Sequence, residues 1–427
     1  MNRFLVAASI AIFAAALLGC EARPLGSALT MSVNGGAGGA TGAGGGGGGG
    51  SSGPVEPTGA GGATPDPATV VLEIAAGHYH TCARMADATV RCWGYNYGGM
   101  IGDGTSRNVQ LTPVPVTQLS GGVLNILASY TDSCGLLFYS SNSGGAWRCW
   151  GSNNYGQLGD GTTTERHLPV PVLGGLAVRQ LSLGVYHSCA LLTDKTVTCY
   201  GANYAGQLGD GTKVDRLVPT PIPGIAGVEQ VVAGAVQSCA LLDGRAVSCW
   251  GSNGMGALGD GTTIDRSTPA PVSGISSAVK VVVGANLVCA FLEGSTVSCW
   301  GSNGYGQVGD GTTINRSTPT PVSGLLGVKD LVAGVNHVCA LLTNETVACW
   351  GFNVHGELGD GSTTNRATPT PVPGLASIVQ ISLGVTHTCA LQRGGAVFCW
   401  GDELALVDAA RASDPYVGRV TPTPITF

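Results

Sequence analysis

The sequence predicts an all-β protein, built as a seven-bladed β-propeller. Cysteines occur in seven pairs, and from Cys149 onward the second cysteine of each pair returns every fifty residues, at positions 149, 199, 249, 299, 349 and 399. A repeat of this length is typical of solenoids, propellers and arrays. The apolar segments are short, rich in Val and Leu, and bounded by Gly, Asn, Asp and Pro, which indicates about four strands in each unit. Seven small sheets packed around an axis form a propeller.

The first nineteen residues have the features of a lipoprotein signal peptide. Arg3 precedes an apolar run from Leu5 to Leu18 that is too short for a comfortable membrane span. Leu17-Leu18-Gly19-Cys20 is similar to the bacterial lipobox, in which the cysteine becomes the lipidated first residue of the mature protein. A plain signal peptide beside a chance cysteine is the alternative. We expect a lipid anchor at Cys20, and therefore a location in the bacterial cell envelope, at the outer membrane or the cell surface.

Residues 20–68 should form a flexible tether, because they are dominated by glycine, including the unbroken run Gly44 to Gly50. The folded propeller is then expected to span residues 69–427. The net charge of −6 argues against a nucleic-acid partner, since phosphate-backbone binding needs a basic face. We expect a monomer.

The cysteine pairs are expected to form disulfides across hairpins. Six pairs stand ten residues apart, and the residue midway between them is Asp, Asn or Gly, all of which tolerate the positive φ of a tight turn. Oxidation is the default in an exported protein, and each short loop would contribute about 2–3 kcal/mol. Free thiols and zinc are the alternatives. The expected pairs are Cys82–Cys92, Cys134–Cys149, Cys189–Cys199, Cys239–Cys249, Cys289–Cys299, Cys339–Cys349 and Cys389–Cys399.

An aromatic residue follows the second cysteine of every pair. It is Trp in six units and Tyr200 in the remaining one. Since neighbouring residues of a strand point to opposite faces, the cysteine and the aromatic ring must both be buried on different sides. The sheets should therefore pack against one another on both faces, with the indoles in the core rather than in a binding site.

The ends of the propeller are expected to close the ring. The chain enters at residues 70–77 and ends with the Thr-Pro-Thr-Pro strand at residues 421–424, a type of strand that elsewhere precedes the first strand of a unit. We therefore expect circular closure by the C-terminal strand, with residues 420–426 completing the sheet begun by residues 70–76. Deletion of the last ten residues should then abolish the fold.

The repeat motifs closely resemble those of the regulator of chromosome condensation repeat family. They are Gly-x-x-His-x-Cys-Ala-Leu-Leu, then Cys-Trp-Gly-x-Asn-x-x-Gly-Gln-Leu-Gly-Asp-Gly-Thr, then Arg-x-x-Pro-x-Pro-Val, and they cover residues 70–427. The resemblance implies a seven-bladed propeller. The eukaryotic namesake is a nuclear guanine-nucleotide exchange factor for a small GTPase, but no exchange-factor residue matches a motif here. Exported bacterial members are more similar to this chain in their expected cellular location. They bind proteins, in some cases as β-lactamase inhibitors.

Two repeated polar positions could suggest metal sites, but both are expected to be structural. His80, His187, His337 and His387 occupy one position of the repeat, where other units have Asp132, Gln237 and Leu287, which suits a hydrogen-bonding role. Each Gly-Asp-Gly loop offers one carboxylate, whereas a calcium loop needs several. The loop aspartates should instead pair with the arginines that follow them, such as Arg216 after Asp210. No catalytic motif, metal or cofactor site is predicted.

The expected function is non-enzymatic protein binding, and the candidate ligand face is the loop after each Cys-Trp-Gly. Exposed aromatic residues on a rigid scaffold make binding hot spots. Local packing of these side chains, an exchange factor, and an envelope enzyme or glycan binder are the alternatives. Other departures from the repeat are the enlarged hairpin at 138–147 and the segment 402–418, which replaces the last Gly-Asp-Gly loop. The candidate residues are Tyr95, Tyr97, Tyr155, Tyr204, Met255, Tyr305, Phe352 and His355.

Overall fold

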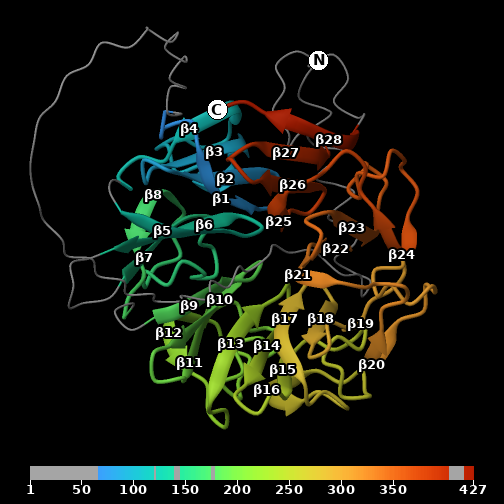
Figure 1. Cartoon of the computed structure of the whole chain (residues 1–427). Helices are drawn as coiled ribbons and strands as arrows, with labels where there is room; N and C mark the ends of the chain where they lie inside the picture. Colours follow the sequence, from blue (N-terminus) through green and yellow to red (C-terminus); the bar gives the residue numbers. More distant parts are fainter. Residues whose placement is uncertain (1–65, 120–121, 139–144, 175–177, 403–417) are drawn as a thin grey trace, which may run out of the picture.

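The protein is a ring of seven four-stranded antiparallel sheets, as the sequence predicted. The structure is a computed structural model that describes residues 66–119, 122–138, 145–174, 178–402 and 418–427. Figure 1 shows the sheets arranged around a common axis like blades, in the order of the chain. Cys20, the expected signal peptide, most of the expected tether and the inner parts of the two departures, 139–144 and 403–417, lie outside the described residues.

Each blade consists of four consecutive strands of the chain. Blade 1 contains β1 (Val71–Ala76), β2 (His80–Met85), β3 (Val90–Tyr95) and β4 (Val109–Pro115), with the short 3-10 turn η2 (Tyr97–Gly99) before β4. Blade 2 contains β5 (Val123–Ala128), β6 (Asp132–Phe138), β7 (Gly145–Gly151) and β8 (Arg166–Pro171), and blade 3 contains β9 (Val178–Leu183), β10 (His187–Leu192), β11 (Val197–Gly201) and β12 (Arg216–Pro221).

The remaining four blades follow the same plan. Blade 4 contains β13 (Val228–Ala233), β14 (Gln237–Leu242), β15 (Val247–Gly251) and β16 (Arg266–Pro271), and blade 5 contains β17 (Ala278–Val283), β18 (Leu287–Leu292), β19 (Val297–Gly301) and β20 (Arg316–Pro321). Blade 6 contains β21 (Val328–Ala333), β22 (His337–Leu342), β23 (Val347–Gly351) and β24 (Arg366–Pro371), and blade 7 contains β25 (Ile378–Leu383), β26 (His387–Gln392), β27 (Val397–Gly401) and β28 (Arg419–Ile425).

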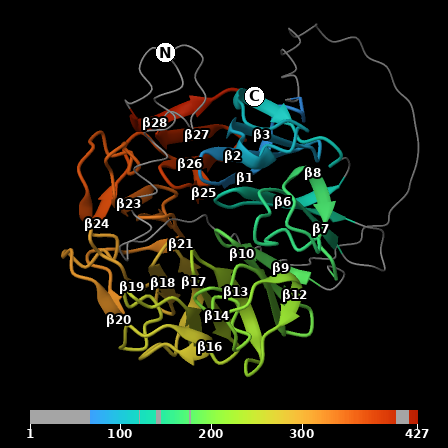
Figure 2. The ribbon, with the colours of Figure 1, turned by 180° about the vertical axis from the view of Figure 1, so that it is seen from behind.

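The first strand of each blade lies nearest the axis and the proline-containing fourth strand lies at the rim, as both views of the ring show (Figures 1 and 2). Proline lacks an N–H donor, so it is tolerated on edge strands. Near the axis, Val185, Ala235, Ala285, Val335 and Val385 form an apolar cluster at the turns between first and second strands. The hub of the ring is therefore packed with side chains from five consecutive blades.

All seven expected cysteine pairs form disulfides between the second and third strands of their blades. The partners stand directly opposite in the antiparallel register, as with Cys189 and Cys199. The cysteines are fully buried, and so is the ring after each second cysteine. The Trp250 indole donates to the Gln207 carbonyl of the preceding blade at 2.9 Å, so the aromatic position joins neighbouring sheets.

The hairpin between the cysteines differs from the expectation in one respect. In blades 5 and 7 the midpoint residue has a positive φ, at Gly294 and Gly394, as expected. In four other units only the residue after the midpoint is left-handed, with φ near +60°, at Ala88, Lys195, Arg245 and Glu345. The loop has three residues, and the last of them is left-handed. The midpoint side chain instead caps the turn: Asp194 Oδ1 accepts from the Thr196 amide at 3.0 Å.

The expected strand exchange between the two ends of the chain is wrong. The C-terminal β28 pairs with β27 inside blade 7, and β1 pairs with β2 inside blade 1. The reason is that the Thr-Pro-x-Pro strand folds back onto the Cys-Trp strand of its own unit, so every unit is complete. Blades 7 and 1 meet through side chains instead, where Gln380 bonds the backbone of Ile74 and Phe427 packs edge-on against Trp93.

None of the helical segments within the described ranges has the length and apolar character that a membrane crossing requires.

Candidate functional site

Two sets of loops meet on one face of the ring. Because the four strands of a blade alternate in direction, the turn between the first and second strands and the loop between the third and fourth lie at the same end. We call this end the loop face. All eight candidate binding residues lie on it, at the end of a third strand or in the loop that follows.

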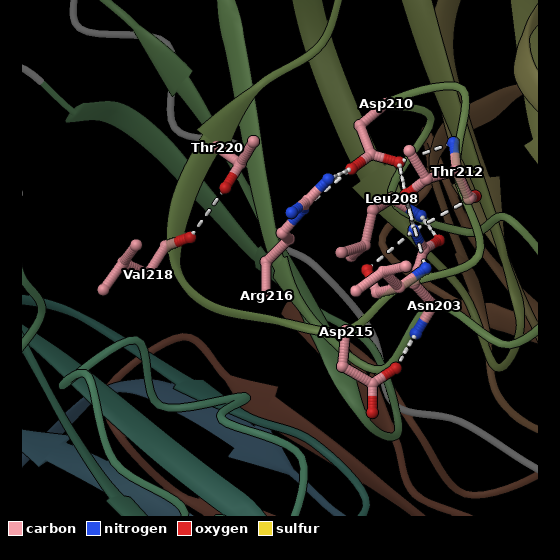
Figure 3. A network of polar contacts seen from close by, with 9 residues as sticks. Asn203, Leu208, Asp210, Thr212, Asp215, Arg216, Val218 and Thr220 are labelled. Carbon is pink, nitrogen blue, oxygen red and sulfur yellow. Dashed lines mark hydrogen bonds and ion pairs between the residues drawn. The ribbon is translucent and has the colours of Figure 1, made fainter.

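A repeated polar network holds the loop between the third and fourth strands. Figure 3 shows it in blade 3, where Asn203 Nδ2 donates to Asp210 Oδ1 at 3.1 Å and Asn203 Oδ1 accepts from the Leu208 amide at 3.0 Å. Asp210 Oδ2 accepts from Arg216 Nε at 2.8 Å. The predicted Asp–Arg pairing is thus confirmed in blades 2–6, and both partners belong to the same blade. Burial opposes ionisation of Asp210, but bonds from Thr212 and Arg216 hold its pKa below the ordinary value.

Blade 1 departs from this network. Gln110 takes the place of the arginine, and its Nε2 donates to Asp103 Oδ2 at 2.7 Å. The loop also contains η2, which brings Tyr97 onto the loop face with 51% of its surface exposed. The Asp103 turn keeps its form, since Asp103 Oδ1 still accepts from the Thr105 amide at 2.9 Å.

The repeated histidines join neighbouring blades. His187 Nε2 lies 2.8 Å from Ser238 Oγ of the next blade, and that hydroxyl donates to the Gln207 carbonyl at 2.9 Å. The hydroxyl must therefore accept from the histidine, which fixes the neutral tautomer with its proton on Nε2. Burial lowers the pKa of His187 to about 3. The bond between His387 and Thr81, at 3.0 Å, closes the ring between blades 7 and 1.

The Gly-x-x-His motif follows from this packing. A Cβ added at Gly184 would lie 2.6 Å from the Gly234 carbonyl of the next blade and 2.7 Å from the ring of His187, so the neighbouring backbone and the histidine both require glycine there. Blade 2 replaces both residues, with Ser129 for the glycine and the smaller Asp132 for the histidine. Ser129 Oγ donates to Asp132 Oδ1 at 2.5 Å. Burial raises the pKa of Asp132 to about 8, so this carboxyl is protonated at neutral pH.

Three of the predicted binding residues lie in one aromatic group. Tyr95 and Tyr97 of blade 1 are parallel, with ring centroids 6.4 Å apart, and Tyr155 of blade 2 lies 5.1 Å from Tyr186 of blade 3. The group continues through residues that sequence reasoning missed. His78 lies between Tyr79 at 3.7 Å and Tyr130 at 3.9 Å, both in stacked geometry, and Tyr130 lies 6.4 Å from Tyr186.

The missed residues share one repeat position, the turn between first and second strands. Blades 1–3 carry His78-Tyr79, Tyr130-Thr131 and Val185-Tyr186 there, whereas blades 4–7 carry Ala235-Val236, Ala285-Asn286, Val335-Asn336 and Val385-Thr386. The aromatic substitutions in three consecutive units were the signal that could have identified them. We call His78, Tyr79, Tyr95, Tyr97, Tyr130, Tyr155 and Tyr186 the aromatic sector.

A cavity of about 350 Å³ opens within the aromatic sector. Tyrosines of blades 1–3 line it together with Asn154 and Gln157 of blade 2. Burial raises the pKa of Tyr79 to about 12, with a smaller contribution from the Asp402 charge, so its hydroxyl stays protonated. Burial also holds the pKa of His78 well below its ordinary value. The walls of the cavity are thus uncharged at neutral pH.

The other predicted residues do not join this group. Tyr305, Phe352 and His355 form a second, smaller cluster across blades 5 and 6, with the Tyr305 and Phe352 centroids 4.9 Å apart. His355 Nδ1 lies 2.9 Å from Glu357, whose hydrogen bond raises the pKa of the imidazole. Tyr204 is 54% exposed, and Met255 contacts Asn315 of the next loop.

Within the described ranges, no three His, Cys, Asp or Glu side chains lie close enough together to hold a metal ion. The four repeated histidines are separated by blade, and each is engaged with a hydroxyl of the next blade. Their role is to join blades, in agreement with the hydrogen-bonding role expected from the Gln and Leu at the same position.

Sequence comparison finds the regulator of chromosome condensation (RCC1) repeat at residues 149–191, 196–241, 246–291, 296–341 and 346–391, with a second version of that repeat at 71–99, 178–207 and 328–357. The chain is 32% identical over 123 residues to the human probable E3 ubiquitin-protein ligase HERC4, covering 28% of this chain and 11% of that protein. It is 30% identical over 133 residues to the ultraviolet-B receptor UVR8 of Arabidopsis thaliana, covering 31% of this chain and 29% of that protein. The matched segment is therefore a minor part of these relatives.

Solved structures show the same architecture. Human WBSCR16 superposes with a TM-score of 0.69 at 22% identity, covering 79% of this chain and 94% of that chain. Prp20p from Saccharomyces cerevisiae superposes with a TM-score of 0.67 at 20% identity, covering 79% of this chain and 85% of that chain. At these identities the likeness establishes the fold alone.

Proposed function

The chain belongs to the RCC1 repeat family, and from that premise we propose that it is a non-enzymatic binding protein that docks a protein partner on its loop face. The observation that carries the proposal is the aromatic sector, seven aromatic side chains gathered on three consecutive blades. Tyrosine anchors on a rigid frame supply much contact area at little conformational cost.

The frame beneath the loop face supports a docking role. Seven disulfides, buried indoles and bonds between blades fix the loops before any partner arrives. A preformed surface loses little conformational entropy on binding, which favours affinity. The solved structure of Prp20p is described with its binding properties to Gsp1p and histones, so a propeller of this fold serves protein binding elsewhere.

The net charge of the chain and its lack of recognisable exchange-factor residues both bear on the class of partner. The acidic net charge of −6 disfavours chromatin or nucleic acid as the target. An exchange factor for a small GTPase is the alternative that the family name suggests, but no residue of this chain is assigned to nucleotide exchange. Because the motif at Cys20 favours export of this chain, we propose a partner among exported proteins, with inhibition of an enzyme as one form that docking would take.

We also propose that the protein is anchored to a membrane by a lipid. The Leu17-Leu18-Gly19-Cys20 motif supports lipidation at Cys20, and the glycine-rich segment that follows would hold the propeller away from the membrane. Replacement Cys20→Ser should move the protein from the membrane fraction to the soluble fraction and abolish labelling by a radioactive fatty acid. Unchanged membrane association and labelling would contradict the anchor.

The binding function is tested by site-specific crosslinking. A photoreactive phenylalanine analogue at Tyr97 should give one adduct of defined mass in cells that make the protein. The same analogue at Asn344, in a hairpin on the opposite face, is the matched control. Adducts from Tyr97 alone would support docking on the loop face. Adducts from neither position, or equal adducts from both, would contradict it.

A further inference from the structure

The cavity in the aromatic sector has a chemistry of its own. It is a concave site of about 350 Å³, near the lower end of the range of about 300–1,000 Å³ for small-molecule sites. Its walls come from three blades and include Tyr95 and Tyr97 of blade 1, Tyr130 of blade 2 and Tyr186 of blade 3. A space of this kind fits a small molecule or one short element of a polymer.

Polar side chains between the rings have unused bonding capacity. His78 is 9% exposed, lines the cavity, and its Nε2 has no hydrogen-bond partner within the described part of the protein. The buried Thr131 Oγ1, also in the lining, is likewise without a partner there. Buried polar atoms of folded proteins are normally satisfied, so these two atoms beside the cavity can bond to water or to a ligand.

The charge of the lining excludes several ligand classes. The lining contains no Lys, Arg, Asp or Glu, so it offers no counter-ion to a phosphate, a carboxylate or an ammonium group. Quaternary ammonium ligands favour aromatic cages, but the polar side chains here would then gain nothing. A proline-rich segment uses aromatic grooves and presents mainly carbonyl acceptors, which would leave the amide and hydroxyl acceptors of the site unused.

One ligand class matches both the rings and the polar groups. The pyranose ring of a sugar has an apolar C–H face, which stacks on an aromatic ring, and hydroxyls that donate and accept. Asn154, Gln157, Ser152, Thr131 and five tyrosines all lie in the lining, and the polar groups of these side chains both donate and accept. We infer that the cavity of the aromatic sector is a saccharide-binding site that takes a neutral pyranose against its tyrosine rings.

This site goes beyond the proposed function because it adds a small neutral ligand to the protein-docking face. Since the cavity opens where Tyr97 is exposed, a sugar carried by a glycoconjugate of the envelope would be held beside a protein docked on the same loops. The two ligands are separable, because the sugar needs the interior rings of the cavity whereas protein docking also uses the exposed rims.

The test is saturation-transfer NMR with the purified full chain. The probes are the methyl glycosides of glucose, galactose, mannose and N-acetylglucosamine, and the disaccharides cellobiose and chitobiose. At least one should receive saturation at the ring C–H protons. The variant Tyr130→Ala should weaken that sugar's binding by about tenfold or more, equivalent to about 1.4 kcal/mol. Tyr204→Ala, at an exposed tyrosine outside the cavity, should leave binding unchanged, with both variants keeping the wild-type circular dichroism.

Three outcomes would overturn the inference. They are transfer to none of the six sugars, binding that Tyr130→Ala leaves intact, and transfer to hexaproline or tetramethylammonium instead of a sugar. If Tyr130→Ala lost its fold, Asn154→Ala would take its place, because Asn154 is exposed and lines the cavity. Crosslinking from Tyr97 is scored separately, so failure of the sugar site and failure of protein docking are distinguishable.

Discussion

Blades 1–3 and blades 4–7 share one frame and differ in what they present on the loop face. Both groups have the cross-strand disulfide and the Asn–Asp network, as in blades 3 and 4. At the turn between first and second strands, however, blades 1–3 carry aromatic side chains, and blades 4–7 carry small aliphatic or polar ones. In this protein, the residues that are the same in every unit build the fold. Substitutions at one position in several consecutive units indicate the surface that differs between blades.

The buried indoles belong to the shared frame, and their loss should give the largest effect on stability. Trp350 is fully buried and its Nε1 donates to the Gln307 carbonyl of blade 5 at 3.0 Å. Trp350→Ala should lower the free energy of unfolding by about 3–5 kcal/mol, measured by urea denaturation. Tyr97→Ala, at the exposed rim, should change it by less than about 0.5 kcal/mol. Similar losses of unfolding free energy in the two variants would contradict the claim that Trp350 stabilises the shared frame and that Tyr97 does not.

Two adjacent asparagines of blade 2 should also differ in their effect on stability, because one is buried and holds the loop and the other is exposed. Asn153 is buried, its Nδ2 donates to the Thr162 carbonyl at 3.0 Å and its Oδ1 accepts from the Leu158 amide at 3.0 Å. Asn153→Ala should cost about 1–3 kcal/mol in the free energy of unfolding, because buried backbone groups lose their partners. Asn154→Ala should leave the melting temperature unchanged, since that side chain is exposed at the cavity. Equal melting shifts in the two variants would refute the assignment.

The histidine position should give opposite pH effects depending on whether a unit carries His, as in blade 6, or Asp, as in blade 2. The pKa of His337 is lowered to about 3, so the unfolded chain takes up a proton below the ordinary pKa of about 6.5 while the folded protein does not. His337 therefore makes stability fall as the pH drops from about 6.5 towards 3. Asp132, with its pKa raised to about 8, is protonated only in the folded protein between about 4 and 8, so its contribution falls as the pH rises.

Two substitutions separate these contributions. His337→Gln, which copies Gln237 of blade 4, should flatten the rise of unfolding free energy with pH between about 4.5 and 6 by about 1.4 kcal/mol per pH unit. Asp132→Asn should steepen the rise by a similar amount between about 4.5 and 7. Urea denaturation at several pH values measures both. A slope that moves in the same direction in both variants would show that the buried histidine and the buried carboxyl are not in the predicted protonation states.

Much of the frame could be predicted from the sequence because it is local to one unit. The cysteine spacing predicted the disulfide pairs, and the Asp-to-Arg spacing predicted the ion pairs, since both join residues of the same blade. The ring closes between blades 7 and 1, but the strand pairing at the closure was mispredicted, because the repeat pattern does not show which strand a proline-containing segment pairs with. The midpoint glycines of blades 5 and 7 are left-handed as expected, whereas in the units with Asp or Asn at the midpoint the left-handed residue is the next one and the Asp or Asn side chain caps the turn.

The site could be predicted only in part. Tyr95, Tyr97 and Tyr155 stood out because they vary within a recognisable loop, whereas His78, Tyr130 and Tyr186 lie in a turn that looked purely structural beside its repeated histidine. Their grouping depends on contacts between blades about fifty residues apart, such as the stacking of His78 on Tyr130. The spacing of the repeat alone does not show which side chains of neighbouring turns touch.

The most direct test of the central claim replaces three residues of the aromatic sector by the residues that blades without aromatic turns carry. The combined variant His78→Ala, Tyr79→Val and Tyr130→Ala copies residues that blades 4 and 5 carry at these positions. In this background, the photoreactive analogue at Tyr97 should no longer capture the partner, while thermal unfolding stays a single cooperative transition. Capture at the original yield by this folded variant would contradict the claim that blades 1–3 hold the binding site.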